Sequence, residues 1–245
     1  MSFDGVHALL FDVFGTVVDW RGSIAREAAP FLASHGQGDR DPERFADAWR
    51  ARYQPSMQAV RAGQRPFVRL DVLHRENLVS ILPSFGIDPD DVDPDELDHL
   101  NRAWHRLDPW PDAVRGLTRM KARFTIAPLS NGNIGLLLNM AKRAGLPWDA
   151  ILGAEVARAY KPAPEAYLRT LDILDLRPEQ ACLVAAHNAD LAAARACGLR
   201  TAFVTRPTED PEPDQAWDLV ARDFLDLADL LDTAQTEPDR ERAAR

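Results

Sequence analysis

The sequence predicts an α/β fold in which a parallel sheet carries an inserted block of helices. Two patterns lead to this prediction. Short apolar runs alternate with helical patterns over residues 113–233, which is typical of parallel strands joined by crossover helices. Residues 20–108 show helical periodicity with no strand pattern between the helices. We therefore expect residues 1–19 and 109–245 to form a sheet domain and residues 20–108 to form a helical bundle inserted into it.

The first strand is expected over residues 7–12, where a short apolar run stops at Asp12. A carboxylate at the carboxyl end of a parallel strand faces the crevice in which open α/β sheets bind ligands. Gly15 then allows the chain to turn sharply. Asp12 is therefore a candidate nucleophile, although this stretch by itself fits a turn residue or a helix cap equally well.

Four helices are expected in the inserted block, over residues 23–32, 44–60, 67–82 and 95–107. Trp49, Tyr53 and Met57 recur every four residues, as the side chains of a bundle core or a pocket wall do. Pro55 lies inside the second helix, so we expect a kink or break near Gln54. Three histidines of the block are expected to be ordinary surface residues, namely His74, His99 and His105.

Residues 108–112 contain two prolines and are expected to form the connection back to the sheet domain. Strands are then expected over residues 124–129, 182–186 and 201–204, with a short strand or turn at 151–156. Helices are expected over residues 113–122, 134–144, 164–174, 191–197 and 223–233. Charged side chains fill the segment 237–245, which is expected to be a frayed end.

Polar side chains follow three of the expected strands. Asp12 follows the first strand, Ser130 and Asn131 follow the second, and residues 187–190 follow the third. Because the carboxyl ends of parallel strands meet at one edge of a sheet, we expect these side chains to converge on a single crevice.

Composition and charge exclude several classes of function. The formal net charge of −9 argues against a nucleic-acid partner, which requires a basic face. No apolar segment is long enough to span a bilayer, and residues 1–5 lack the basic and apolar regions of a signal peptide, so no membrane partner is expected. Cys182 and Cys197 show no metal or redox spacing and are expected to be free thiols of a cytoplasmic protein.

Four ordered motifs resemble those of the haloacid dehalogenase superfamily, namely Asp12-Val-Phe-Gly-Thr16, Leu129-Ser-Asn-Gly132, Tyr160-Lys-Pro162 and Asp190. The resemblance covers nearly the whole chain. It implies a Rossmann-like core with the helical block as the family's cap, and it implies that Asp12 is the nucleophile.

Most members of that superfamily are phosphatases, in which a second Asp two residues after the nucleophile protonates the leaving group and further acidic residues hold Mg²⁺. Here these positions are Phe14 and Ala186. Mg²⁺ requires several oxygen ligands, and phosphoryl transfer requires its positive charge. The sequence therefore argues against a Mg²⁺-dependent phosphatase, which stays the alternative, with Asp12 as phosphoryl acceptor.

The sequence resembles instead the type II L-2-haloacid dehalogenase branch. That branch has an aromatic residue at the position of Phe14 and an Arg on the first long cap helix, as at Arg50. Its Lys lies six residues before a Tyr, as Lys161 and Tyr167 do. The resemblance implies that small (S)-2-haloacids are hydrolysed to (R)-2-hydroxyacids through an ester on Asp12, without a metal or an organic cofactor. Halide leaves as a stable anion, which agrees with the missing general acid.

The resemblance implies where the substrate's two negative ends bind. Arg50 and Asn131 would bind the departing halide, because donors stabilise charge where it develops. Ser130, with backbone N–H groups of the strand–helix turns, would bind the substrate carboxylate. From spacing alone Arg50 is equally compatible with a solvated helix position.

The resemblance also implies a charged cluster around the nucleophile. Lys161 would keep Asp12 ionised, and Asp190 would orient Lys161 and help to activate water. Tyr167 would brace the cluster, with a plain core position as the alternative. Thr16 would hydrogen-bond close to the nucleophile.

The last motif departs from the pattern Ser-Ser-Asn-Ala-Trp-Asp that is frequent in the branch. Residues 185–190 read Ala-Ala-His-Asn-Ala-Asp, so His187 stands in place of Asn and Ala189 in place of Trp. His187 is a candidate contact to the hydrolytic water, with a structural role as the alternative. Asn188 is a further candidate for substrate or halide binding.

The sequence leaves the preferred haloacid, the leaving halide and the oligomeric state open. Cap helices in this family often form dimer contacts, and the apolar faces here permit a homodimer without requiring one. Outside enzymes, the alternative is a fold retained as a binding or scaffold module.

Overall fold

The computed structural model describes residues 3 and 5–234. Its centre is a parallel sheet of five strands in the order β4-β1-β5-β6-β7. The strands are β1 (Ala8–Phe11), β4 (Thr125–Pro128), β5 (Ala181–Ala185), β6 (Arg200–Val204) and β7 (Leu219–Ala221). The predicted α/β fold with a parallel sheet is confirmed. The expected frayed segment 237–245 lies outside the described residues.

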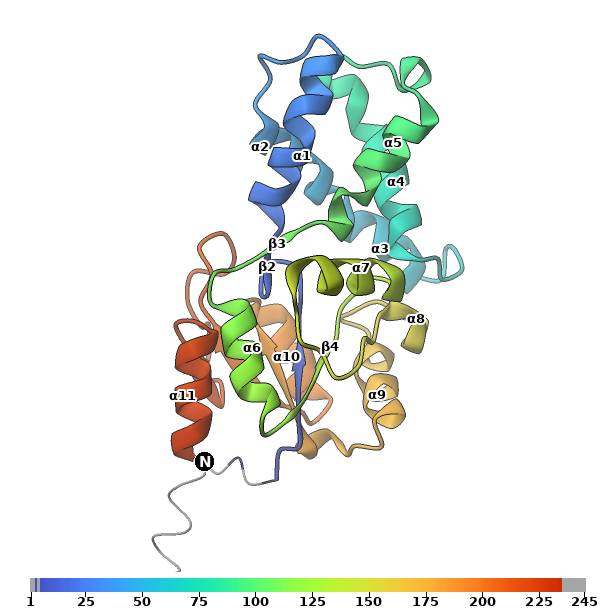
Figure 1. Cartoon of the computed structure of the whole chain (residues 1–245). Coiled ribbons are helices and arrows are strands. Elements are labelled where there is room, and N and C mark those ends of the chain that lie inside the picture. Colours follow the sequence, from blue (N-terminus) through green and yellow to red (C-terminus); the bar gives the residue numbers. More distant parts are fainter. Residues whose placement is uncertain (1–2, 4, 235–245) are drawn as a thin grey trace, which may run out of the picture.

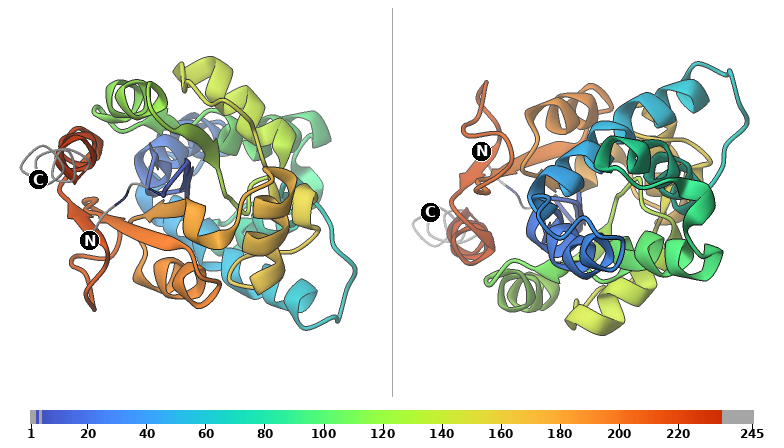
Figure 2. Two further views of the ribbon diagram at one scale, coloured as in Figure 1. Left: turned by 90° about the horizontal axis from the view of Figure 1, so that it is seen from below. Right: turned by 90° about the horizontal axis from the view of Figure 1, so that it is seen from above.

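The two faces of the sheet are buried under different helices, which is why its strands read as continuous apolar runs. Leu9 and Phe11 pack on one face and Ala8 and Leu10 on the other, following the two-residue period of a strand. Figure 2 shows helices on both sides of the sheet. They are α6 (Ala113–Lys121), α7 (Ile134–Ala144) and α11 (Phe224–Ala234) on the first face, and α9 (Pro164–Ile173) and α10 (Asn188–Ala196) on the second.

The residues between β1 and α6 form a separate group of helices beyond the carboxyl ends of the strands (Figure 1). They are α1 (Trp20–Ser34), α2 (Pro42–Ala51), α3 (Tyr53–Arg61), α4 (Leu70–Ile81) and α5 (Pro94–Asn101). The two chain crossings to this group pair with each other as a short antiparallel ribbon of β2 (Val18–Asp19) and β3 (Asp108–Pro109). No helix of the described residues is both long and apolar enough to cross a membrane.

The break in the second expected helix lies at Arg52, two residues before the position expected from Pro55. Pro55 instead occupies the first turn of α3. There its missing N–H has no helical partner to lose, so the proline starts a helix rather than interrupting one. Arg52, the single residue between the two helices, keeps a right-handed helical backbone with φ −80° and ψ −15°.

Three further expectations about elements were wrong in detail, and one strand was missed. Residues 151–156, expected as a short strand or turn, form no strand, and a short helix α8 (Ala154–Ala157) begins within them. The helix expected at 95–107 ends at Asn101 and continues as a 3-10 turn over Arg102–His105. Helix α10 begins at Asn188, three residues before its expected start. Strand β7 was not expected, because its three residues are too few to show the two-residue period of a strand.

Candidate active site

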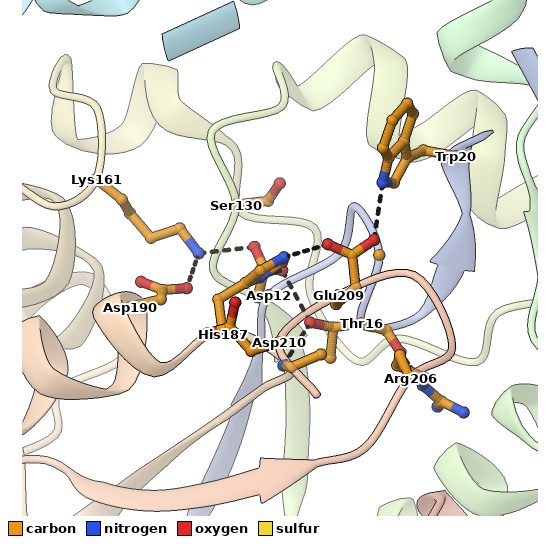
Figure 3. A network of polar contacts seen from close by, with 12 residues as sticks. Asp12, Thr16, Trp20, Ser130, Lys161, His187, Asp190, Arg206, Glu209 and Asp210 are labelled. Carbon is orange, nitrogen blue, oxygen red and sulfur yellow. Dashed lines mark hydrogen bonds and ion pairs between the residues drawn. The ribbon is translucent and has the colours of Figure 1, made fainter. Parts of the chain in front are cut away.

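Asp12 follows β1 directly and lies at the carboxyl edge of the sheet, where the sequence predicts it (Figure 3). Its backbone N–H donates to the Val184 carbonyl of β5 at 3.0 Å, so the parallel ladder fixes its position. Its Oδ2 accepts a hydrogen bond from Thr16 Oγ1 at 2.9 Å. The same hydroxyl oxygen accepts from the Ala186 N–H at 2.9 Å. Thr16 therefore ties the turn after β1 to the end of β5.

Lys161 lies between two carboxylates. Its Nζ is 2.9 Å from Asp12 Oδ1 and 2.5 Å from Asp190 Oδ2. Lys161 is 6% exposed and Asp12 is 7% exposed, so the pair is shielded from water. The Lys161 backbone N–H donates to Asn131 Oδ1 at 2.7 Å, and the Tyr167 hydroxyl donates to Asp190 Oδ1 at 2.6 Å. Residues from three separate motifs thus hold one ammonium in place.

This arrangement fixes the charges of the cluster. Burial by itself would raise the pKa of Asp12, but the charge of Lys161 and the hydrogen bond from His187 outweigh it, and the net pKa lies well below the ordinary carboxyl range. Burial by itself would lower the pKa of Lys161, but Asp12 and Asp190 raise it above its ordinary value. Asp12 is therefore an anion and Lys161 a cation at neutral pH.

His187 bridges Asp12 and a second carboxylate, Glu209. Its Nδ1 is 3.1 Å from Asp12 Oδ2, and its Nε2 is 2.7 Å from Glu209 Oε2. Burial opposes the charged ring, but hydrogen bonds to the two carboxylates raise the pKa of His187 to about 10. His187 is therefore an imidazolium that donates from both ring nitrogens.

The loop between β6 and β7 supplies two residues that the sequence analysis missed, Glu209 and Arg206. Arg206 Nε donates to the Thr16 carbonyl at 2.8 Å, and its guanidinium makes a bidentate pair with Asp112 at 2.7 and 3.0 Å. The loop directly follows β6, at the same carboxyl edge as Asp12, so its polar residues were a strand-end signal that the sequence analysis did not use. Gly15 agrees with this position, because any Cβ there would collide with the Glu209 carboxylate.

A cavity of about 450 Å³ opens in front of Asp12. The sheet domain contributes polar side chains to its wall, including Asp12, Asn131, Lys161, His187, Asp190 and Asp210. The helical group contributes the opposite wall, with Arg50, Tyr53, Gln54, Gln58 and Arg61. A volume of this size and a wall of converging polar groups are typical of a small-molecule site.

Arg50 brings positive charge to the cavity from the end of α2. Its guanidinium carbon lies 4.1 Å from the ring centre of Tyr53 and 5.2 Å from that of Trp20. Its Nη1 is buried and has no hydrogen-bond partner among the described residues. A buried donor with a positive charge and no partner is costly unless an anion binds to it. The structure thus presents a cation for a ligand opposite the nucleophile.

A family model described as haloacid dehalogenase-like hydrolase matches residues 6–198, which include Asp12, Lys161, His187 and Asp190. The chain belongs to the haloacid dehalogenase-like hydrolase family. It is 32% identical to (S)-2-haloacid dehalogenase 1 of Pseudomonas sp. (strain CBS-3) over 216 residues, 85% of this chain and 88% of that protein.

Two solved structures are similar to this family member over 93% of its length. The crystal structure of a defluorinating L-2-haloacid dehalogenase is 56% identical, with a TM-score of 0.90 and 95% of that chain covered. The structure of a dehalogenase with intermediate complex is 26% identical, with a TM-score of 0.79 and 98% of that chain covered.

The Mg²⁺ site used by phosphatases of the superfamily does not fit this family member. Both oxygens of Asp12 are already bound by Lys161, Thr16 and His187. Phe14 and Ala186 offer no side-chain oxygen at the two positions where the phosphatase pattern requires carboxylates. Among residues 3 and 5–234, no group of three or more histidine, cysteine or acidic side chains is arranged to hold a metal ion.

Five of the residues predicted to bind substrate or halide do not line the cavity, namely Phe14, Thr16, Ser130, Tyr167 and Asn188. Thr16 and Tyr167 instead hold Asp12 and Asp190. Phe14 is buried against Tyr53 and Trp104, which places its ring behind the wall rather than in it. Ser130 is buried, and its hydroxyl oxygen accepts from the Gly132 N–H at 3.1 Å. The assignment of Asn188 to the binding site was wrong in geometry. Its side chain binds the β6–β7 loop instead, through Glu212, Asp214 and Trp217.

His74 is also not the surface residue that the sequence predicts. It is 1% exposed and stacks on Trp104 at 4.3 Å between ring centres. Burial lowers the pKa of His74 to about 3, so the ring is neutral. His99 is exposed as expected, and His105 hydrogen-bonds Asp71 at 3.0 Å. His74 lies on the apolar stripe of α4, next to Leu73 and Leu78, so its place in the helical period was the signal for burial. The sequence analysis judged it instead by its polar side chain.

Proposed function

We propose that this chain is an (S)-2-haloacid dehalogenase that converts small (S)-2-haloacids to (R)-2-hydroxyacids without a metal ion. The observation that carries the proposal is the cavity in which the Asp12 carboxylate faces the unpartnered Arg50 guanidinium. The (S)-2-haloacid dehalogenase of Pseudomonas, to which the chain is 32% identical, supports the substrate class. The absence of a second carboxylate at Phe14 supports halide over phosphate as leaving group, because halide needs no proton.

In the first step, Asp12 Oδ1 attacks the halogen-bearing carbon and displaces halide with inversion. Oδ2 accepts two hydrogen bonds, from Thr16 and His187, whereas Oδ1 accepts one, from Lys161. A carboxylate oxygen has about two in-plane lone pairs, so Oδ1 keeps one for the attack. The product is an ester on Asp12, and the related structure described as an intermediate complex supports a covalent route.

Donors from both walls of the cavity receive the substrate's negative ends. Arg50 stabilises the halide as charge develops on it, with Asn131 as a second donor at the sheet edge. Backbone N–H groups of the strand–helix turns hold the substrate carboxylate, and Ser130 supports the turn at Gly132 from behind the cavity wall. The low dielectric between the cavity walls strengthens these contacts relative to water.

In the second step, water attacks Asp12 Cγ and its proton passes to Asp190. Negative charge then develops on Oδ2, where the Thr16 hydroxyl and the His187 imidazolium donate. The bond between Cγ and Oδ1 breaks, the leaving hydroxyacid oxygen takes the proton from Asp190, and the second proton of the water passes to solvent as Asp12 is regenerated as a carboxylate. Lys161 offsets the negative charge of Asp12 and Asp190 throughout, and Tyr167 holds Asp190 in position.

Two further proposals concern the helical group and the leaving halide. We propose that residues 20–108 act as a cap that carries Arg50 over the core formed by residues 1–19 and 109–245. The proposal also includes fluoride as a leaving group, supported by the defluorinating dehalogenase that is 56% identical to this chain. Release of fluoride ion from (S)-2-fluoropropionate, measured with a fluoride electrode, tests this point separately.

Halide release from L- and D-2-chloropropionate, with EDTA present, tests the main proposal. The wild type should release chloride from the L isomer alone, and Asp12→Asn should release none. Chloride release that stops on adding EDTA would contradict a metal-independent reaction. Mg²⁺-dependent release of phosphate from p-nitrophenyl phosphate, without dehalogenation, would instead establish the phosphatase alternative.

A further inference from the structure

Glu209 is a buried carboxylate that touches the active site only through His187 (Figure 3). Its side chain is 8% exposed. Its Oε2 accepts from His187 Nε2 at 2.7 Å, and its Oε1 accepts from the Trp20 indole N–H at 2.8 Å. Thr208 Oγ1 donates to the same Oε1 at 3.2 Å. Each carboxylate oxygen of Glu209 therefore has a donor, and one of these donors belongs to the first residue of the helical group.

The backbone around Glu209 is held against the nucleophile turn. Arg206, three residues earlier, binds both the Thr16 carbonyl and Asp112, and it is buried. Gly15 leaves the space that the Glu209 carboxylate occupies. Burying a carboxylate costs desolvation free energy. Its position against the turn that follows Asp12 therefore indicates a function for the Glu209 charge.

We propose that Glu209 is a positioning residue that keeps His187 protonated and directed at Asp12 Oδ2 during hydrolysis of the ester. This inference rests on the dehalogenase function proposed above. In the free enzyme, two carboxylates stabilise the imidazolium, Asp12 and Glu209. Esterification removes the charge of Asp12, and among residues 3 and 5–234 Glu209 is then the only anion in contact with His187. The second carboxylate thus matters most in the second half of the reaction.

The other charged groups around His187 do not replace Glu209. Lys161 and Arg50 line the same cavity and disfavour a second cation. Asp190 is held by Lys161 and Tyr167, and Asp210 caps the Asn188 N–H at 2.7 Å. Without Glu209, the pKa of His187 in the ester should fall, and the ring that faces the developing oxyanion should lose its positive charge as it deprotonates.

Trp20 links Glu209 to the helical group. Its indole N–H fixes Glu209 Oε1, while its ring stacks near Trp104 and lies 5.2 Å from the guanidinium carbon of Arg50. The residue that holds Glu209 therefore also contacts the proposed halide-binding cation. Trp20→Phe removes the N–H donor and keeps an aromatic ring, so it should weaken hydrolysis in the same direction as loss of the Glu209 charge.

Glu209→Gln tests the proposal because it keeps the size of the side chain and removes its charge. Rapid mixing with L-2-chloropropionate should give a burst of about one chloride per active site, followed by a steady rate reduced roughly tenfold or more. The value of kcat/KM, which reports ester formation, should change little, while kcat falls. Mass spectrometry of the quenched variant should show the protein with a 1-carboxyethyl group in ester linkage. The kcat of the variant should decline at a lower pH than that of the wild type.

Glu212→Gln is the matched control, since it removes the same charge from an exposed position of the same loop. It should keep the wild-type kcat and pH profile. Unchanged kcat and no ester accumulation in both Glu209→Gln and Trp20→Phe would overturn the role of Glu209, while wild-type turnover would leave the dehalogenase function intact. No chloride release by the wild type would overturn the function itself. A loss of kcat/KM equal to the loss of kcat would assign Glu209 to ester formation or folding instead.

Discussion

The ammonium of Lys161 and the carboxylate of Asp12 form an ion pair with an N–O distance of 2.9 Å at the carboxyl edge of the sheet. The two residues are 149 positions apart in the sequence, and both are buried. A buried pair of this kind is weak evidence for stability but strong evidence for a defined electrostatic environment. Here it keeps the candidate nucleophile ionised at the wall of the cavity.

Lys161→Met should destabilise the fold and abolish dehalogenation. The substitution removes the buried ammonium that Asp12 and Asp190 share, and it leaves His187 as the cation beside Asp12. Breaking a buried pair in this way typically costs about 3–5 kcal/mol of unfolding free energy. The pKa of Asp12 should also rise, because its main counter-charge is lost. Urea unfolding and chloride release measure the two effects. Lys142→Met, at an exposed position of α7, is the control and should change neither. Full activity in Lys161→Met would contradict the charge assignment.

Arg50→Lys should reduce kcat for chloride release roughly a hundredfold, the scale found for losing one preorganised donor to developing charge. Lysine keeps the positive charge but lacks the planar donors that point from the ring face of Tyr53 into the cavity. Steady-state kinetics with L-2-chloropropionate measure the change. Arg44→Lys, exposed on the same helix, should behave as the wild type. An equal effect of both substitutions would place the cause in α2 rather than in the cavity.

Gly15→Ala should impair activity through Glu209. Gly15 has φ +90°, and an added Cβ would displace the Glu209 carboxylate from its place beside His187. Gly36→Ala provides the matched control, because Gly36 has φ +71° with open space around the position of a Cβ. Both variants should lose about 1–2 kcal/mol of unfolding free energy from backbone strain. Only Gly15→Ala should accumulate the ester in quenched reactions, and accumulation in neither variant would contradict the prediction.

The contribution of His187 to stability should depend on pH. Its pKa is raised from 6.5 to about 10 in the folded protein, with burial opposing and the two carboxylates favouring the charged ring. A group with a raised folded pKa stabilises fully below its unfolded pKa and loses that effect as the pH rises through the folded pKa. The difference in unfolding free energy between wild type and His187→Gln should therefore be largest below pH 6.5 and shrink toward pH 10.

Urea titrations at a series of pH values measure this difference. His99→Gln, which replaces an exposed histidine of α5, is the control and should give a small difference with little dependence on pH. A difference for His187→Gln that stays constant from pH 6.5 to 10 would show that the ring is neutral in the folded protein.

Local patterns in the sequence were sufficient for the parallel sheet and for most helices. Apolar runs that end at Asp12, Asn131 and His187 placed three strand ends at one edge, because parallel strands that share a sheet must align their carboxyl ends. The strand predictions depend on backbone direction and side-chain period, which neighbouring residues determine. The position of Lys161 and Asp190 beside Asp12 was instead implied by the resemblance of the ordered motifs to the haloacid dehalogenase superfamily.

The sequence by itself thus determined the fold class, the candidate nucleophile and the cation beside it. Only the tertiary structure decided what surrounds them. Glu209 belongs to a loop without periodicity, His74 is buried by packing of the helical group, and Asn188 turns away because the β6–β7 loop offers it better partners. Such contacts join segments far apart in the chain, and their free energy depends on burial and distance, which no local pattern contains.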